Sequence, residues 1–360
     1  MNKKIAILPG DGIGPEVLMQ ATLVLKAIAE VYGHTFSFEE GKIGAAAIDA
    51  TGNPFPEETE KLCREADAIL FGAIGDPKYD DDPKAKVRPE QGLLAMRKKL
   101  GLFANIRPVA SYDALLPISP LKEHIIKGSD FVVFRELTSG IYFGQPRGRS
   151  EDGQSAFDTC NYSKEEIIRV SKLAFEAARN RRKHVTLVDK ANVLATSRLW
   201  RETVQELASE YPDVTLDFMF VDNAAMKIIQ QPTYFDVVLT ENMFGDIITD
   251  EASVISGSLG MLPSASVGTS SSLYEPIHGS YPQAAGKNIA NPFGAILSAA
   301  MLLEYSFGLI EESNAIKEAV DSCLAEGYVT EDIQKNDPKS TSEVGAKVVS
   351  LLKKYEAVNS

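Results

Sequence analysis

The sequence predicts an α/β fold with a large, mostly parallel sheet flanked by helices, and three observations support this prediction. Runs of β-branched and aromatic residues repeatedly precede stretches with helical periodicity. The alternation of such runs with helices indicates parallel strands that are covered on both faces. The chain has 360 residues, 44% of them apolar, which is enough for two or three domains that each bury a core.

Strands and helices are expected to alternate from the N-terminus onward. The expected strands are residues 4–8, 68–71, 131–134, 185–188, 216–221 and 235–239, and the expected helices are residues 16–32, 191–209 and 224–229. Loops rich in Gly, Pro and Asp follow at 72–92, 137–153 and 256–292. They exceed the usual connection length, so we expect some of them to be functional.

The chain is acidic, with 50 Asp and Glu against 37 Lys and Arg and a formal net charge of −13. This charge disfavours binding to nucleic acid or to anionic membranes. The longest nearly uninterrupted apolar stretch, 294–303, is far shorter than the roughly 20 residues of a membrane span. The N-terminal residues contain too few apolar positions for a signal peptide, and the three cysteines are widely spaced without a C-x-x-C motif. We therefore expect a cytoplasmic protein without disulfides or structural zinc.

A glycine-rich segment, LPGDGIGPE at 8–16, joins the first strand to the first helix. Pro15 stands where the dinucleotide fingerprint requires its last glycine, and no Lys-Ser/Thr of a P-loop follows. We interpret the segment as a tight turn with Pro15 at the first helical position. The sequence leaves open whether a ligand approaches the backbone closely at Gly12 or Gly14.

Three aspartates follow strands of the expected sheet. Asp222 comes directly after 216–221, and Asp246 and Asp250 follow 235–239 at a spacing that places both on one face of a helix. Carboxylates without nearby His or thiolate partners suit a hard divalent cation, Mg²⁺ or Mn²⁺. The alternative is a solvated helix face, which the apolar neighbours of the pair disfavour.

Lys190 follows the strand at 185–188 and is expected to open a helix, whose dipole would lower its pKa. It is a candidate general base, although many such lysines are ordinary surface residues. Lys190, Arg135 and the three aspartates all lie on the carboxyl side of a strand, which is the edge where open α/β sheets bind ligands.

Three arginines and a tyrosine complete the candidate site. Arg97, Arg107 and Arg135 together would suit a substrate with two carboxylates, because arginine binds carboxylates in a bidentate manner. Surface salt bridges are the alternative for each arginine. Tyr142 lies between Gly140 and Gly144, where a proton donor and a packing residue are equally consistent with the local sequence.

The order of several long motifs resembles the metal-dependent decarboxylating β-hydroxyacid dehydrogenases of the isocitrate/isopropylmalate dehydrogenase family. The resemblance covers nearly the whole chain. The motifs are LPGDGIGPE at 8–16, RPEQGLL at 88–94, LFANIRP at 102–108, RELTSGIYFG at 135–144, DKANVL at 189–194, FGDIITD at 244–250, GSLGMLPSAS at 257–266, EPIHGS at 275–280 and AGKNIANP at 285–292.

The resemblance implies roles for the candidate residues. Tyr142 would be the proton donor and Lys190 the base, and the three arginines would hold the carboxylates of a 3-substituted malate. Asp222, Asp246 and Asp250 would bind Mg²⁺ or Mn²⁺, with Asp222 also contacting substrate. Lys190 and Asp222 look like residues that the neighbouring subunit contributes, which implies a homodimer with composite active sites.

The resemblance also implies the family's own two-domain fold, which is not a Rossmann fold. Residues 1–102 with 257–360 would form the cofactor-side domain, and residues 103–256 the domain for dimerisation, substrate and metal. NAD would be bound from the 76–90 loop and from 275–291. The implied cofactor-binding residues are Ile13, Asp76, Glu90, Glu275, His278, Gly279, Gln283 and Asn291.

Three positions bear on the specificity for cofactor and substrate. NAD-dependent members of the family usually carry an acidic residue at the position of Gln283, so the neutral amide here departs from their pattern. However, no Lys, Arg or Tyr at 283–285 would bind a 2′-phosphate. NAD is therefore preferred over NADP. Leu93 and Leu94 would suit an isopropyl group on the substrate, unless both are simply core residues of a helix. D-malate, tartrate and isocitrate are the alternative substrates. The alternative functions from other classes of protein are a regulatory binding protein and a phosphotransferase.

Overall fold

The computed structural model describes residues 1–80 and 87–359. The chain divides into two compact units, one made of Met1–Gly101 with Gly257–Ser360 and the other of Leu102–Ser256. The first unit is therefore assembled from both ends of the chain. Which unit binds the cofactor and which one dimerises stay predictions.

The sheet of the first unit is built around its N-terminal strand. In order across the sheet, its strands are β2 (Thr35–Glu40), β1 (Asn2–Gly10), β3 (Ala68–Ala73), β12 (Ser272–Pro276) and β11 (Pro263–Gly268). The neighbours pair in parallel except for the antiparallel pair of β11 and β12.

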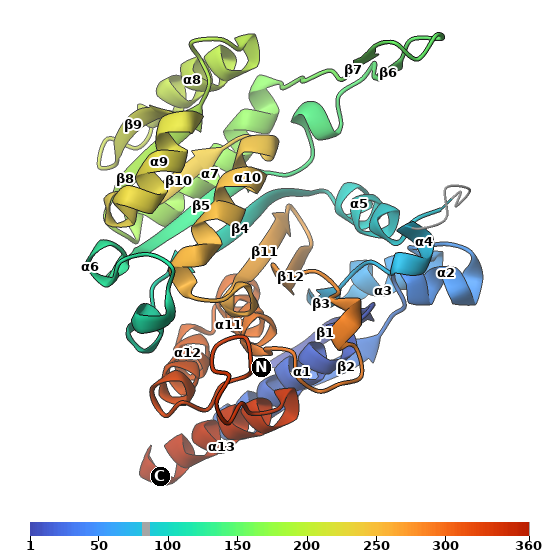
Figure 1. The fold of residues 1–360 in the computed structure, drawn as a ribbon, viewed down its shortest axis with the longest axis vertical. Helices are drawn as coiled ribbons and strands as arrows, with labels where there is room; N and C mark the ends of the chain where they lie inside the picture. The colour runs from blue at the N-terminus through green and yellow to red at the C-terminus, as the bar shows by residue number, and fades with distance from the viewer. Residues whose placement is uncertain (81–86, 360) are drawn as a thin grey trace. The chain divides into compact units, whose positions relative to one another are not determined.

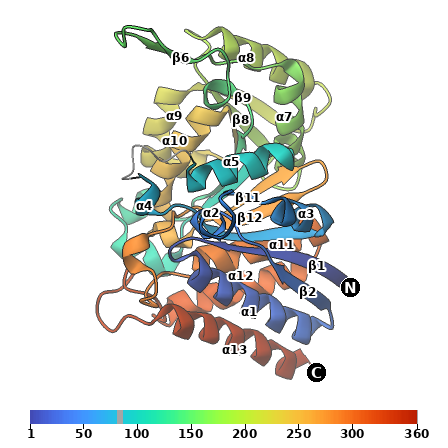
Figure 2. The same cartoon turned by 90° about the vertical axis from the view of Figure 1, so that its right-hand side faces the viewer.

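Helices cover both faces of this sheet (Figure 2). One face carries α1 (Gly14–Tyr32), α11 (Phe293–Phe307), α12 (Ile310–Ala325) and α13 (Thr341–Asn359), and the other carries α2 (Ala45–Thr51) and α3 (Glu57–Glu65). The apolar run at 294–303 belongs to α11, which is buried along most of its length. Over the described parts of the chain, the structure contains no helix that is both long and apolar enough to cross a membrane.

The glycine-rich segment forms the turn from β1 into α1. Gly10 and Gly12 adopt φ values of 70° and 59°. A Cβ atom would lie 1.8 Å from the Ala73 carbonyl oxygen at Gly10 and 2.0 Å from the Ser280 carbonyl oxygen at Gly12. Close packing of the backbone therefore requires these glycines, and Ser280 occupies the space beside Gly12. The helix begins at Gly14, so Pro15 is its second residue and not its first.

The main strands of the second unit are also mostly parallel. In order, its strands are β4 (Leu102–Ala110), β5 (Asp130–Glu136), β10 (Val237–Thr240), β8 (His184–Asp189) and β9 (Thr215–Phe220). Among these strands, β4 and β5 pair in an antiparallel manner and the other neighbours pair in parallel. The α/β class with a helix-flanked, mostly parallel sheet is confirmed.

In this unit, one face of the sheet carries α7 (Lys164–Arg179) with α8 (Ala195–Ala208), and the other carries α9 (Val221–Gln230) with α10 (Asn242–Ala252) (Figure 1). Phe131 and Val133 of β5 pack in one buried cluster with Ile228 of α9 and Ile248 of α10. This core packs α9 and α10 against β5. The remaining short elements are α4 (Pro77–Asp80), α5 (Pro89–Lys99), α6 (Glu123–Ile126), β6 (Gly148–Arg149) and β7 (Ala156–Phe157).

Candidate active site

Arg135, near the end of β5, lies against the first turns of α10. Its side chain is buried, and its Nε and Nη2 donate to Asn242 Oδ1 at 3.0 and 2.7 Å. Its Nη1 donates to a carboxylate oxygen of Asp246. Gly245 allows this close approach, because a Cβ atom there would lie 2.7 Å from Arg135 Cγ.

Arg107, on β4, reaches the same face of α10. Its Nε donates to Asn105 Oδ1 at 2.7 Å, and its Nη1 donates to Thr249 Oγ1 at 2.6 Å. Its Nη1 lies 3.4 Å from Asp250 Oδ1, and its Nη2 lies 3.8 Å from Asp246 Oδ1. The expected helix with Asp246 and Asp250 one turn apart is therefore present, and both carboxylates lie beside guanidinium groups.

Tyr142 belongs to the short 3₁₀ helix at Gly140–Tyr142. Its hydroxyl donates to Asp246 Oδ2 at 2.9 Å, and the Arg135 guanidinium carbon lies 5.9 Å from the centre of its ring. Burial, followed by the hydrogen bond to Asp246, raises the pKa of Tyr142 above its ordinary value. The phenol therefore stays protonated near neutral pH, as a proton donor must.

The structure thus brings five predicted residues together in one unit. They are Arg107, Arg135, Tyr142, Asp246 and Asp250. Two positive and two negative charges meet here, with the Asp250 side chain 71% exposed. Such a cluster offers arginines for an anion and carboxylates for a cation.

Lys190 and Asp222 form a separate pair in this unit. Lys190 Nζ lies 2.6 Å from Asp222 Oδ1, and this hydrogen bond lowers the pKa of Asp222. Within residues 1–80 and 87–359, no group of three or more His, Cys, Asp or Glu side chains is arranged to hold a metal ion. In one chain, Asp222 therefore does not join Asp246 and Asp250.

The expected helix start at Lys190 is wrong. The backbone N–H groups of Val193 and Leu194 donate to the Lys190 carbonyl oxygen at 3.0 and 2.9 Å, which closes a tight turn. The helix α8 begins only at Ala195, so the helix dipole does not act on Lys190. Asp222, by contrast, lies in the first turn of α9 and not before it.

A cavity of about 630 Å³ in the first unit contains half of the predicted cofactor residues. Ile13, His278, Gly279 and Asn291 line it. His278 Nε2 is buried and has no hydrogen-bond partner among the described residues, and burial lowers the pKa of this imidazole. An unpartnered buried nitrogen in a cavity is consistent with a polar ligand.

Several residues that were not predicted from the sequence line the same cavity. Asp332 accepts hydrogen bonds from Ser258 Oγ and, at 3.0 Å, from Asn291 Nδ2. Tyr281 and Lys335 also line it. Ser258 and Tyr281 lie in a loop that was expected to be functional, whereas no motif marked Asp332 or Lys335.

The other predicted cofactor residues do not line this cavity. Asp76 accepts a hydrogen bond from the backbone N–H of Lys78 at 3.0 Å, and Gln283 is exposed. Glu275 is buried and lies 3.0 Å from Nη2 of Arg97, a predicted substrate residue. Glu90 lies in the first turn of α5.

The predicted pair Leu93 and Leu94 follows on α5, where Leu93 is half-buried and Leu94 is 45% exposed. Leu94 is therefore not a core residue of the helix in this chain. Residues 81–86 of the predicted 76–90 cofactor loop lie outside the described residues.

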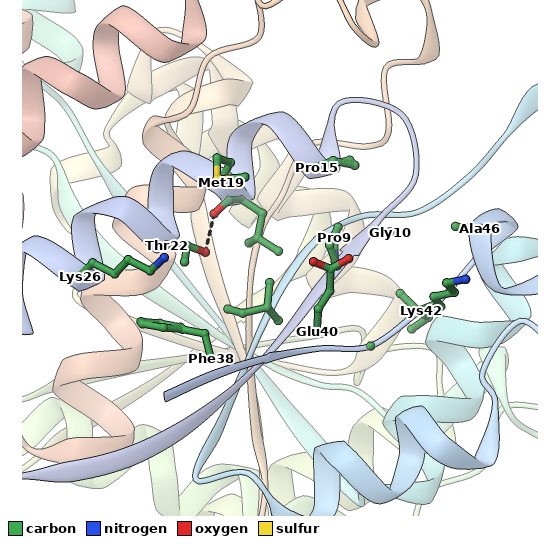
Figure 3. A pocket seen from close by; sticks show the side chains of 14 residues that line it. Pro9, Gly10, Pro15, Met19, Thr22, Lys26, Phe38, Glu40, Lys42 and Ala46 are labelled. Atoms are coloured by element: carbon green, nitrogen blue, oxygen red, sulfur yellow. Dashed lines mark hydrogen bonds between the residues drawn. The ribbon is translucent and has the colours of Figure 1, made fainter. Parts of the chain in front are cut away.

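A further cavity of about 480 Å³ lies between α1 and β2 (Figure 3). Met19 and Lys26 of α1 and Phe38 and Glu40 of β2 are among its lining residues. None of the predicted site residues lines it.

Comparison with known proteins gives consistent matches over the full chain. A sequence model described as isocitrate/isopropylmalate dehydrogenase matches residues 4–348. The 3-isopropylmalate dehydrogenase of Bacteroides fragilis is 57% identical over 356 residues, covering 98% of this chain and 100% of that protein. The 3-isopropylmalate dehydrogenase of Bacillus subtilis is 56% identical over 359 residues, covering 97% and 98% of the two chains.

Solved structures agree with these relatives. The isocitrate dehydrogenase of Methylococcus capsulatus superposes with a TM-score of 0.87 at 32% identity, covering 98% of this chain and 99% of the other. A β-decarboxylating dehydrogenase of Thermococcus kodakarensis gives a TM-score of 0.83 at 35% identity, covering 99% and 98%.

Proposed function

The chain belongs to the isocitrate/isopropylmalate dehydrogenase family, and we propose that it converts 3-isopropylmalate and NAD into 4-methyl-2-oxopentanoate, CO₂ and NADH. This reaction is a cytoplasmic step of leucine biosynthesis. The observation that carries the proposal is the cluster at the end of β5, where two buried arginines, a protonated tyrosine and two aspartates meet.

The substrate is a dianion with an apolar substituent. Arg107 and Arg135 supply two rigid guanidinium groups for its carboxylates, and Arg97 is the third. Leu93 and Leu94 would contact the isopropyl group. The exposure of Leu94 supports this role, because an exposed leucine gains free energy when a ligand covers it.

The donor set fits a hard divalent cation. Asp246 and Asp250 supply carboxylate oxygens from one chain, and we propose that Asp222 of the partner completes the set. Mg²⁺ or Mn²⁺ bound there would supply Lewis-acid stabilisation of negative charge on the substrate oxygens.

A nicotinamide coenzyme fits the 630 Å³ cavity, because the buried Nε2 of His278 needs a hydrogen-bond partner. Ile13, Gly279 and Asn291 would contact it there, and Asp76, Glu90, Glu275 and Gln283 are the remaining proposed contacts. NAD would supply the hydride acceptor. The neutral amide of Gln283 can bind a ribose hydroxyl.

The protein's own groups move the protons. Lys190 takes the proton of the 2-hydroxyl group while the carbon is oxidised, and Tyr142 protonates the enol carbon after CO₂ has left. Because Lys190 and Asp222 pair with each other and not with the arginine cluster, we propose that both act in the site of the partner subunit. The functional unit would then be a homodimer.

The test is the appearance of reduced coenzyme, followed by absorbance, with 3-isopropylmalate, isocitrate, D-malate and tartrate. Each substrate is supplied with NAD or NADP, in the presence and absence of Mg²⁺. We expect Mg²⁺-dependent reduction of NAD with 3-isopropylmalate. No signal with this substrate would overturn the proposal.

A further inference from the structure

Asn242, the first residue of α10, is 1% exposed and has every polar group of its side chain bonded. Its Oδ1 accepts from Nε and Nη2 of Arg135 at 3.0 and 2.7 Å. Its Nδ2 donates to the Ser139 carbonyl oxygen at 3.1 Å, and its backbone N–H donates to Tyr162 Oη at 3.0 Å.

These bonds connect two groups of the proposed active site. Arg135 is the penultimate residue of β5, whereas Ser139 immediately precedes the short 3₁₀ helix that carries Tyr142. Both groups then meet at Asp246, whose two oxygens accept from Arg135 Nη1 and from the Tyr142 hydroxyl. The buried amide of Asn242 thus contacts Arg135 directly and the loop of Tyr142 through Ser139.

We propose that Asn242 is a positioning residue for the reaction proposed above. It holds the Nε and Nη2 atoms of the Arg135 guanidinium, so that Nη1 lies on the side of Asp246, where the substrate would bind. It also holds the 139–142 loop, so that Tyr142 would reach the reacting carbon. The inference rests on the proposed function.

An amide is suited to this position, because one end must accept and the other must donate. A carboxylate would neutralise the charge of Arg135 and could not donate to the Ser139 carbonyl oxygen. A smaller neutral side chain would leave buried polar groups without partners.

The test compares Asn242→Asp and Asn242→Ser with the control Asn180→Asp, an exposed amide at the end of α7 whose Nδ2 donates to the Glu176 carbonyl oxygen at 3.2 Å. For Asn242→Asp, we expect KM for 3-isopropylmalate to rise at least about tenfold and kcat to fall by up to about a hundredfold, because small misplacements at a reacting centre are costly. KM for NAD should stay within about twofold, since the cofactor residues lie elsewhere. Asn242→Ser should show the same pattern more weakly.

Several outcomes separate positioning from simple loss of the fold. The inference is overturned if the wild type is active while both Asn242 variants keep KM and kcat. It is also overturned if KM rises equally for substrate and NAD as the melting temperature falls. A wild type that is inactive with 3-isopropylmalate would instead overturn the proposed function, and this inference with it.

Discussion

The ammonium group of Lys190 donates a 2.6 Å hydrogen bond from Nζ to Asp222 Oδ1. Replacing Lys190 with Met keeps the approximate length of the side chain and removes the proposed base. We expect NADH formation from 3-isopropylmalate to fall by about a hundredfold or more, which is the usual contribution of a general base. A supplied 2-oxo acid intermediate should still lose CO₂, because that step does not need the lysine as a base.

Two assays check this prediction, coenzyme absorbance for oxidation and CO₂ release for decarboxylation. Lys172→Met, at an exposed position of α7, is the matched control and should leave both rates unchanged. Full turnover by Lys190→Met would contradict the assigned role.

Glu241, just before α10, makes stability depend on pH. It is 5% exposed, and burial raises its pKa from 4.5 to about 7. The raised pKa means that the fold favours the protonated carboxyl group. Its stabilising contribution is complete below pH 4.5 and is lost as the pH rises to about 7.

Glu241→Gln should remove this loss of stability at higher pH. The variant should gain free energy of unfolding over the wild type as the pH rises, by up to about 3 kcal/mol, since one pKa unit corresponds to about 1.4 kcal/mol. Denaturant titrations at a series of pH values measure the difference, with the exposed Glu210→Gln as control. Parallel stability curves for wild type and Glu241→Gln would refute the prediction.

At the scale of elements, the contact between α10 and β5 requires a residue without a side chain at Gly245. A Cβ atom at Gly245 would lie 2.7 Å from Arg135 Cγ and 2.8 Å from Arg135 Cβ, closer than real Cβ contacts. Gly245→Ala should therefore cost about 1–3 kcal/mol of stability, as overpacking does, and raise KM for the substrate by displacing Arg135.

Chemical unfolding and steady-state kinetics together check the effect of Gly245→Ala. Gly148→Ala is a suitable control, because the nearest atom to a Cβ there is 4.0 Å away. If the two alanine variants behave alike, close packing against Arg135 is not what Gly245 provides.

Sequence patterns predicted some of these elements and not others, for physical reasons. The i, i+4 spacing placed Asp246 and Asp250 on one helix face, because local geometry alone decides that. The strands β2, β4, β11 and β12 were missed, since they carry charged, Ser or Pro residues in place of long apolar runs. The late start of α8 was missed because a turn closed on the Lys190 carbonyl oxygen precedes it.

Residues that act through tertiary contacts had no signal in the sequence. Asn242 contacts Arg135 across 107 positions, and Ser258 contacts Asp332 across 74. No local period or motif encodes such pairs. The family resemblance supplied roles for the functional residues, but not for those that hold them in place.

At the scale of the molecule, the net charge of −13 includes the charges of the site residues and those of the many acidic residues elsewhere in the chain. Arg107 and Arg135 are buried arginines beside Asp246 in an otherwise acidic chain. Their positive charge can attract a dicarboxylate only at short range, because salt screens longer distances. The remaining acidity favours solubility and does not select the substrate.

Exposed apolar side chains lie beside the site residues of the second unit. Val193, Met226 and Ile247 are 63%, 55% and 58% exposed. Val193 lies three residues after Lys190, Met226 four residues after Asp222, and Ile247 directly after Asp246. Apolar residues in these positions support an interface that covers the elements carrying the proposed composite site.

Hybrid dimers test the composite site directly. Lys190→Met and Asp246→Asn should each be inactive alone, but a mixed dimer would contain one site with both substitutions and one site with neither. Equal amounts combined with free subunit exchange should therefore recover about a quarter of the wild-type activity, because half of the dimers are hybrids in a symmetric twofold assembly. Sedimentation of the same samples establishes that dimers are present. If the mixture sediments as dimers and stays inactive, Lys190 and Asp246 act within one chain, and the two-subunit site is wrong.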